Sequence, residues 1–278
     1  MPASYEDRML RVLDYIHDNP AGDLSLDALA DVAAMSRFHW HRVFHGITGE
    51  TCADAVRRIR LHRAACSLVQ TDLAIGQVAK ACGYPNLQSF TRVFREGYGL
   101  TPAAFRQRGE VRSLLSPNAK GARFMYPVET LNVETRRLFA IAHEGPYLEI
   151  GRAFEKLSHI AGSRGLWPHA QGMVGLYYDD PSAVAPEDLR SYAALIMGPD
   201  AELPDILEEL EYDGGKFAVL HYKGPYSELK PAYDYLFGKW LPESGEEPRD
   251  APAMEIYLNN PADTDPEQLL TDICMPVA

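Results

Sequence analysis

A helical pattern that occurs twice within the first hundred residues constrains the fold of this chain more than any other feature. In the later copy, residues 78–84 read as a short helix closed by Gly83, and a longer helical segment follows. At helical spacing, Phe90, Val93 and Phe94 of that segment fall on one apolar stripe. The opposite face consists of Leu87, Gln88, Thr91, Arg92 and Arg95. A helix, a glycine turn and a helix with a polar outer face are typical of a helix-turn-helix motif, whose second helix enters the major groove of DNA.

The earlier copy lies about fifty residues upstream. Residues 29–35 correspond to the short helix, and Arg42-Val43-Phe44 repeats Arg92-Val93-Phe94. The apolar stripe of this copy is predicted to be Trp40, Val43, Phe44 and Ile47. Its predicted outward face holds Arg37, Phe38, His41, Arg42 and His45. Ala34 stands where the later copy has Gly83, which predicts a slightly different turn.

One long helix is predicted between the two copies, because residues 51–70 contain no glycine or proline. At ~1.5 Å per residue it is about 30 Å long, close to the ~34 Å that separates successive major grooves on one face of DNA. This spacing suits a monomer that reads two grooves. Four cations on this helix either meet phosphates or form a solvated charged face: Arg57, Arg58, Arg60 and Arg63. Further helices over 5–18, 25–34 and 102–107, the last two with Ser25 and Thr101 as N-caps, complete an all-α domain over residues 1–110.

The charge of the chain is divided unevenly along its length. Residues 1–112 hold 14 Lys and Arg against 12 Asp and Glu, a balance of +2, whereas residues 113–278 hold 13 against 27, a balance of -14. No segment reaches the ~18 apolar residues of a membrane span and no signal peptide is evident, so we expect a cytoplasmic protein with no membrane partner. The four cysteines lack paired spacing, and no metal site or cofactor is predicted.

Residues 111–125 have the Ser, Pro, Asn and Gly content of a linker, and the pattern beyond them changes to strands and repeats. The apolar run 138–147 is matched by 217–226, and each ends in a Gly-Pro-Tyr turn before a helix. Two further strands follow in each copy, at 175–181 and 191–197, then at 255–261 and 269–275. The sequence therefore predicts an α+β domain of two β-α-β-β repeats over residues 126–278. A cleft between the repeats is the expected place for a ligand.

The first hundred residues resemble the AraC/XylS family of bacterial transcription regulators. The likeness rests on Cys82-Gly83-Tyr84, on Thr91-Arg92-Val93-Phe94-Arg95 and on Gly99-Leu100-Thr101-Pro102. It implies DNA contacts from the outward residues of both recognition helices: Arg37, Phe38, His41, Arg42, Leu87, Gln88, Ser89, Thr91 and Arg92. The side-chain chemistry agrees, since Arg pairs with guanine, Gln with adenine and an apolar group with the thymine methyl. An ordinary polar helix surface is the alternative.

Residues 126–278 resemble the GyrI-like effector-binding domain, through the Gly-Pro-Tyr turns and the strand Glu255-Ile256-Tyr257. The order of the two domains is similar to that of Rob-type regulators. The resemblance implies a pocket where Glu255 faces aromatic side chains, with Tyr147, Trp167, Tyr177, Tyr226 and Tyr257 as candidates. Gly175 occupies the place of Glu255 in the first repeat. His143 and His221 lie at equivalent strand ends, which indicates structural turn contacts.

We therefore expect a DNA-binding transcription regulator, an activator by analogy with the family, and not an enzyme. Its predicted partners are double-stranded DNA, a small amphipathic cation bound by Glu255, and RNA polymerase as a further candidate. A buried carboxylate without a partner favours a positive ligand. Two alternatives stay open: a hydrolase with Glu255 as general base, or a second domain that only binds another protein.

Overall fold

The computed structural model describes residues 4–109, 125–261 and 263–278, which belong to two compact units. The first unit comprises Met1–Arg37 and Ile47–Lys120, and the second comprises Phe38–Gly46 and Gly121–Ala278. Apart from residue 125, the predicted linker lies outside the described residues. Within the described part, no helix combines the length and the apolar character that a membrane crossing requires.

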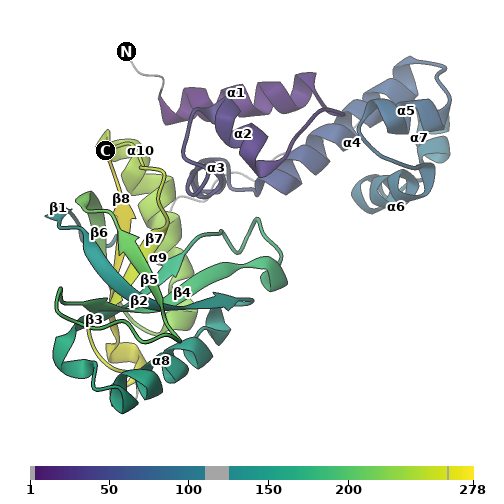
Figure 1. Cartoon of the computed structure of the whole chain (residues 1–278). Helices are drawn as coiled ribbons and strands as arrows, with labels where there is room; N and C mark the ends of the chain where they lie inside the picture. The colour runs from purple at the N-terminus through teal and green to yellow at the C-terminus, as the bar shows by residue number, and fades with distance from the viewer. Residues whose placement is uncertain (1–3, 110–124, 262) are drawn as a thin grey trace. The chain divides into compact units, whose positions relative to one another are not determined.

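The first unit is helical, as predicted (Figure 1). Its helices are α1 (Tyr5–Asp18), α2 (Leu26–Ala33), α4 (Cys52–Gln70), α5 (Ile75–Ala81), α6 (Leu87–Tyr98) and α7 (Pro102–Arg108). The predicted N-caps are confirmed, because the side chains of Ser25 and Thr101 accept hydrogen bonds from the backbone N–H three residues on. Around α6, the unit has a core to which α4 contributes Leu61 and Leu68, α6 contributes Phe90 and Phe94, and α7 contributes Phe105.

The two turns differ as the sequence suggested. Gly83 has φ +79°, and a Cβ there would lie 2.4 Å from the Pro20 carbonyl oxygen, so no other residue fits without a backbone shift. Ala34 has φ 51° and is the one residue other than glycine with a positive φ in the described chain. The helix after it, α3 (Trp40–Thr48), does not include Arg37 and Phe38, which were predicted to lie on its outward face and which precede it in the chain.

The four arginines of α4 all have partners inside the first unit. Arg58 forms a bidentate ion pair with Glu50, at 2.6 and 3.0 Å. Arg60 donates to the carbonyl of Pro20 and Arg63 to that of His17, so both fasten α4 to the end of α1. Arg57 pairs with Glu96 of α6. The four arginines therefore do not form one uniformly solvated face: Arg58 and Arg60 are half-buried, whereas Arg57 and Arg63 are exposed.

The second unit contains one eight-stranded antiparallel sheet of strand order β1-β6-β8-β7-β3-β4-β2-β5. The strands are β1 (Val128–Val133), β2 (Arg136–Glu144), β3 (Ala170–Tyr177), β4 (Arg190–Met197), β5 (Glu208–Tyr212), β6 (Gly215–Lys223), β7 (Ala253–Tyr257) and β8 (Leu270–Pro276). Exchanging the strands of one repeat for those of the other gives the same order read from the opposite end, which agrees with the predicted duplication. Each repeat begins with an additional strand, β1 or β5, which pairs with the other repeat at a sheet edge.

Both faces of this sheet are buried. On one face, α8 (Gly151–Ser163) packs over Phe139, Leu195 and Tyr177 of the first repeat (Figure 1). The opposite face carries Leu138, Phe217 and other residues of both repeats in a second core. The helix of the second repeat is α9 (Lys230–Tyr235), which continues through a π-helical segment, η5 (Leu236–Trp240), into α10 (Leu241–Ser244). Glu255 and Tyr257 alternate with Met254 of the second core, so they point to the helix-covered face.

Candidate functional sites

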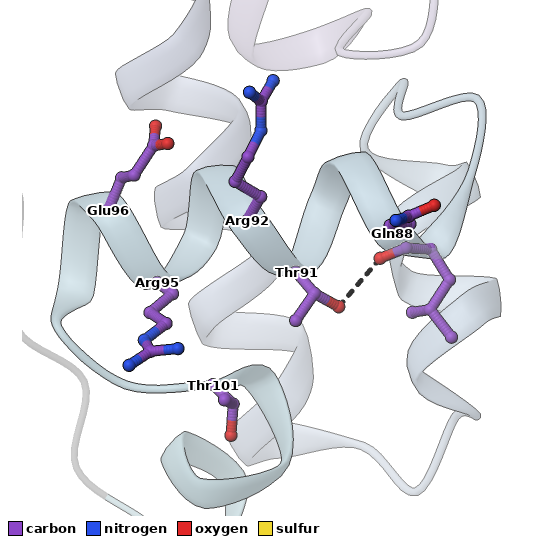
Figure 2. A pocket seen from close by; sticks show the side chains of 7 residues that line it. Gln88, Thr91, Arg92, Arg95, Glu96 and Thr101 are labelled. Atoms are coloured by element: carbon purple, nitrogen blue, oxygen red, sulfur yellow. Dashed lines mark hydrogen bonds between the residues drawn. The ribbon is translucent and has the colours of Figure 1, made fainter.

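The outer face of α6 forms a groove. Asn86 caps the start of this helix by accepting from the Ser89 N–H, and Gly99 ends it in the left-handed conformation. The apolar stripe is buried as predicted, with Phe90 and Phe94 fully enclosed. The groove has a volume of about 760 Å³ and is lined by Leu87, Gln88, Thr91, Arg92, Arg95, Glu96 and Thr101 (Figure 2). Of the residues predicted to contact DNA, α6 therefore presents Leu87, Gln88, Thr91 and Arg92 together.

The groove is cationic with hydrogen-bonding side chains around it. Glu96 is neutralised by Arg57 of α4 at 3.0 Å, whereas Arg92 and Arg95 form no ion pair among the described residues. Ser89 differs from its neighbours, because its hydroxyl donates to the carbonyl of Asn86 and its side chain is half-buried at the helix start. Thr91 donates to the carbonyl of Leu87, as the dashed line in Figure 2 shows.

Glu255 lies at the centre of the sheet of the second unit, where β7 of one repeat pairs with β3 of the other. Its direct partner in the register is Gly175. The Glu255 side chain is buried, with 5% of the residue exposed. Tyr233 donates to one carboxylate oxygen at 2.8 Å and Tyr257 to the other at 3.0 Å. Burial raises the pKa of Glu255, while the two hydroxyl donors and the nearby Arg42 oppose that rise.

Four of the five predicted aromatic residues gather around this carboxylate. The Tyr177 and Tyr257 hydroxyls are hydrogen-bonded at 2.7 Å, and the rings of Tyr147 and Tyr226 lie edge-on to them. Gly175 makes this pair possible, since a Cβ there would lie 2.9 Å from each hydroxyl oxygen. Trp167 lies next to Gly162 near the end of α8, and no contact recorded among the described residues joins it to the cluster.

Two further aromatic residues belong to this site, Phe154 and Tyr233, and neither was among the residues predicted from the sequence. The Phe154 ring packs edge-on against Tyr257 with centroids 5.3 Å apart, and Tyr233 donates to Glu255. Each lies seven residues after the tyrosine of its Gly-Pro-Tyr turn. This shared offset was a signal in the sequence that would have identified both.

Helix α3 supplies further residues to the second unit, and two residues of its predicted outward face, His41 and Arg42, contact that unit. His41 is 5% exposed, and its ring lies 3.6 Å from Asp180. Burial lowers the pKa of His41 to about 4, against the attraction of Asp180. Arg42 donates to the carbonyl of Asp179 at 2.9 Å and lies over the rings of Tyr233 and Phe237. Helical periodicity identified the polar side of α3 but not the surface that covers it.

The remaining predicted positions lie near this contact. Phe38 is half-buried with its ring edge-on to Tyr178, and Arg37 is exposed. His143 and His221 have different partners despite their equivalent places. His143 contacts the Ser191 hydroxyl at 3.1 Å, and His221 lies between Asp272 and Glu129. The hydrogen bond to Asp272 is the main cause that raises the pKa of His221.

Comparisons with known proteins agree with this two-part structure. A family model described as a GyrI-like small molecule binding domain matches residues 126–278, and a helix-turn-helix domain model matches residues 29–108. The regulatory protein SoxS of Escherichia coli is 32% identical over 97 residues, which cover 35% of this chain and 91% of SoxS. The bifunctional transcriptional activator/DNA repair enzyme AdaA of Bacillus subtilis is 36% identical over 107 residues, or 38% of this chain.

The match spans only 51% of the length of AdaA. Among solved structures, the C-terminal domain of EcmrR matches 56% of this chain and 99% of its own length, with a TM-score of 0.46 and 16% identity.

Proposed function

Because this chain belongs to the family of GyrI-like small molecule binding domains and carries an AraC-type helix-turn-helix domain ahead of it, we propose that it is a transcription regulator controlled by a small effector. The observation that carries the proposal is the exposed face of α6. That face combines, in one groove, an amide, an apolar side chain and two cations that form no ion pair within the described part of the chain. These are the groups that read base edges in the major groove.

On this proposal, Arg92 pairs with a guanine, Gln88 with an adenine, and Leu87 meets a thymine methyl. The second reading surface lies on α3 and on the residues just before it, and consists of Arg37, Phe38, His41 and Arg42. Since one chain carries both recognition helices, the protein acts as a monomer on about 20 base pairs, given the ~10-bp groove repeat. Activation, through contact with RNA polymerase, is the direction that we propose.

The proposed effector is a lipophilic cation. A buried carboxylate is stabilised by a positive partner, and the aromatic faces around Glu255 add cation–π attraction of about 0.5–2 kcal/mol. Burial, followed by the Glu255 charge, raises the pKa of Tyr233 and Tyr257 well above that of ordinary tyrosine, so both remain hydroxyl donors. The hydrolase alternative has less support, because the two groups that donate to Glu255 are tyrosine hydroxyls and the described contacts join it to no nucleophile.

Three experiments on the full chain test the proposal. Calorimetric titration compares methyltriphenylphosphonium with neutral triphenylphosphine oxide, and we expect tight binding of the cation only. Selection from random duplexes followed by footprinting should yield one operator of two adjacent half-sites. Sedimentation of that complex should give one protein per duplex. Equal affinity for both ligands would contradict the ligand class, and the absence of any selected sequence would contradict sequence-specific regulation.

A further inference from the structure

We infer that Arg42 is an internal cation that occupies the effector site and is exchanged for the effector when the protein binds DNA. The inference rests on the proposed function and concerns how its two sites are coupled. The same guanidinium belongs to the predicted DNA-reading face of α3 and to the aromatic cluster beside Glu255.

The position of Arg42 is that of a bound cation. Its guanidinium carbon lies 4.6 Å from the centroid of the Tyr233 ring and 5.2 Å from that of Phe237. These two rings are parallel within 2° with centroids 6.1 Å apart, and the guanidinium lies within cation–π distance of both. One guanidinium nitrogen donates to the carbonyl of Asp179 at 2.9 Å. A planar cation on such a surface is the arrangement that cation–π attraction favours.

The ring below Arg42 is also the ring that holds the carboxylate, since the Tyr233 hydroxyl donates to Glu255. The Arg42 charge lowers the pKa of Glu255, so the two groups attract each other through the cluster. An external cation that uses the face of Tyr233 and the charge of Glu255 therefore competes with Arg42 for the same interactions.

The hydrogen bonding of Arg42 is incomplete in this position, and this favours its replacement by a ligand. Its second terminal nitrogen is buried and has no hydrogen-bond partner among the described residues. A buried donor without an acceptor destabilises the contact. A guanidinium on a base edge or beside phosphate regains such partners. The contact of Arg42 with the two rings is thus favourable, but an external cation can replace Arg42 there.

The backbone of α3 is fitted to the same surface. At Gly46, an added Cβ would lie 2.2 Å from the Cα of Gly238 in η5, so the two segments meet at paired glycines. His39, just before α3, stacks on Phe237 with centroids 5.3 Å apart. The side chain of Arg42 cannot contact a base edge while it lies on Tyr233 and Phe237. Docking of α3 and DNA reading by Arg42 therefore exclude each other.

Coupling then follows from linkage. A cation that replaces Arg42 frees it for DNA, and DNA that captures Arg42 empties the site for the cation, by the same factor in both directions. Typical couplings of this kind are about 5- to 150-fold. We expect methyltriphenylphosphonium to raise operator affinity at least about fivefold.

Three variants of the full chain separate this inference from the proposed function. Arg42→Met keeps the stem without the charge, so it should bind the phosphonium at least about fivefold more tightly without DNA, while its operator affinity falls. Gly46→Ala keeps the guanidinium but cannot keep the close contact with Gly238. It should bind both phosphonium and operator more tightly than the wild type. Arg92→Ala, at the matching place in α6, should weaken operator binding and leave phosphonium affinity unchanged.

The control for Gly46→Ala is Gly76→Ala in α5, where an added Cβ meets nothing within 4 Å. Amide hydrogen exchange supplies a direct readout, because phosphonium should accelerate exchange in residues 40–48 of the wild type. If Arg42→Met and Gly46→Ala bind phosphonium like the wild type, the exchange of cations is wrong, although the ligand class stands. If no variant binds phosphonium at all, the proposed ligand itself fails.

Discussion

The recognition helices α3 and α6 share an Arg-Val-Phe sequence, yet their arginines lie in opposite environments. Arg92 of α6 is exposed on the groove beside Gln88. Arg42 of α3, at the matching place, lies on two aromatic rings and donates to a backbone carbonyl. The apolar sides behave alike, since Phe44 and Phe94 are both fully buried. Helical periodicity thus determines which side of each helix is buried, and tertiary packing determines what its polar side meets.

The largest effect that tests this contrast is expected at Glu255, the carboxylate beside Arg42. Glu255→Gln keeps the shape and removes the charge, so methyltriphenylphosphonium should bind more weakly by about 2–5 kcal/mol. Affinity for neutral triphenylphosphine oxide should hardly change. Calorimetric titration of the full chain measures both. Without the carboxylate, Arg42 also loses part of its attraction, so operator affinity without ligand should rise modestly.

A matched control is Glu149→Gln, which removes an exposed acid from the same unit. It should leave both titrations unchanged. Equal weakening of the charged and neutral ligands by Glu255→Gln would show that this carboxylate only maintains the pocket shape through Tyr233 and Tyr257.

Much of the fold followed from local signals. The bounds of α1 and the caps at Ser25 and Thr101 could be predicted because capping and amphipathic periodicity act within one helix. Strands β1 and β5 were missed for a physical reason: they lie at the sheet edges, and their mostly exposed or polar residues show no alternating apolar pattern. Each of these strands pairs with a strand of the other repeat, β1 with β6 and β5 with β2, and such long-range pairing leaves no signal in a short stretch of sequence.

The site could be predicted only in part. Glu255 and four tyrosines were identifiable from the resemblance and the repeat, and they lie together in the structure. Trp167 was grouped with them on aromatic character, which does not report position, and among the described residues no printed ring contact joins it to the cluster. The role of Arg42 could not be read from α3, since the aromatic rings that it contacts lie nearly 200 residues later in the chain.

Arg92→Ala tests the role of the exposed arginine of α6, in contrast to the partly buried Arg42 of α3. Arg92 forms no ion pair with any residue that the structure describes, and its loss should cost about 1–3 kcal/mol of operator affinity and relax the preference at one base position. Footprinting and competition with single-base operator variants give both numbers. Unchanged affinity and an unchanged base preference would show that Arg92 belongs to an ordinary polar surface.

A pH effect should distinguish the helices, because α6 contains no histidine while α3 contains His41. Burial, opposed by Asp180 and Asp179 and supported by Arg42, lowers the pKa of His41 from 6.5 to about 4. The folded state then binds fewer protons than the unfolded chain. Stability is complete above pH 6.5 and falls as the pH drops toward 4, by about 1 kcal/mol between pH 6.5 and 5.5.

Urea unfolding across that range, for the wild type and His41→Gln, measures this loss. The variant should lose less stability on acidification, because one of the buried neutral histidines is gone. His39, whose pKa burial lowers to about 3, should still contribute in the variant. Identical pH profiles would show that His41 is not buried in solution and that α3 is undocked.

The smallest effect is expected at Glu96, the one carboxylate of the α6 groove. Unlike Glu255, it is half exposed, with 51% of its side chain accessible, and its pair with Arg57 is therefore worth only about 0.2–1 kcal/mol of stability. Glu96→Gln should leave unfolding nearly unchanged and raise operator affinity by less than about 1 kcal/mol, since an acid is removed from the DNA-facing side. If the released Arg57 then meets a phosphate, the slope of log affinity against log salt steepens by about 0.9.

Arg57→Gln should weaken operator binding instead, because Glu96 then remains without its cation. A fall in operator affinity for Glu96→Gln would mean that this carboxylate positions Arg57 for DNA. Glu96 and Glu255 would then each act through an arginine, and would differ only in what Arg57 and Arg42 contact.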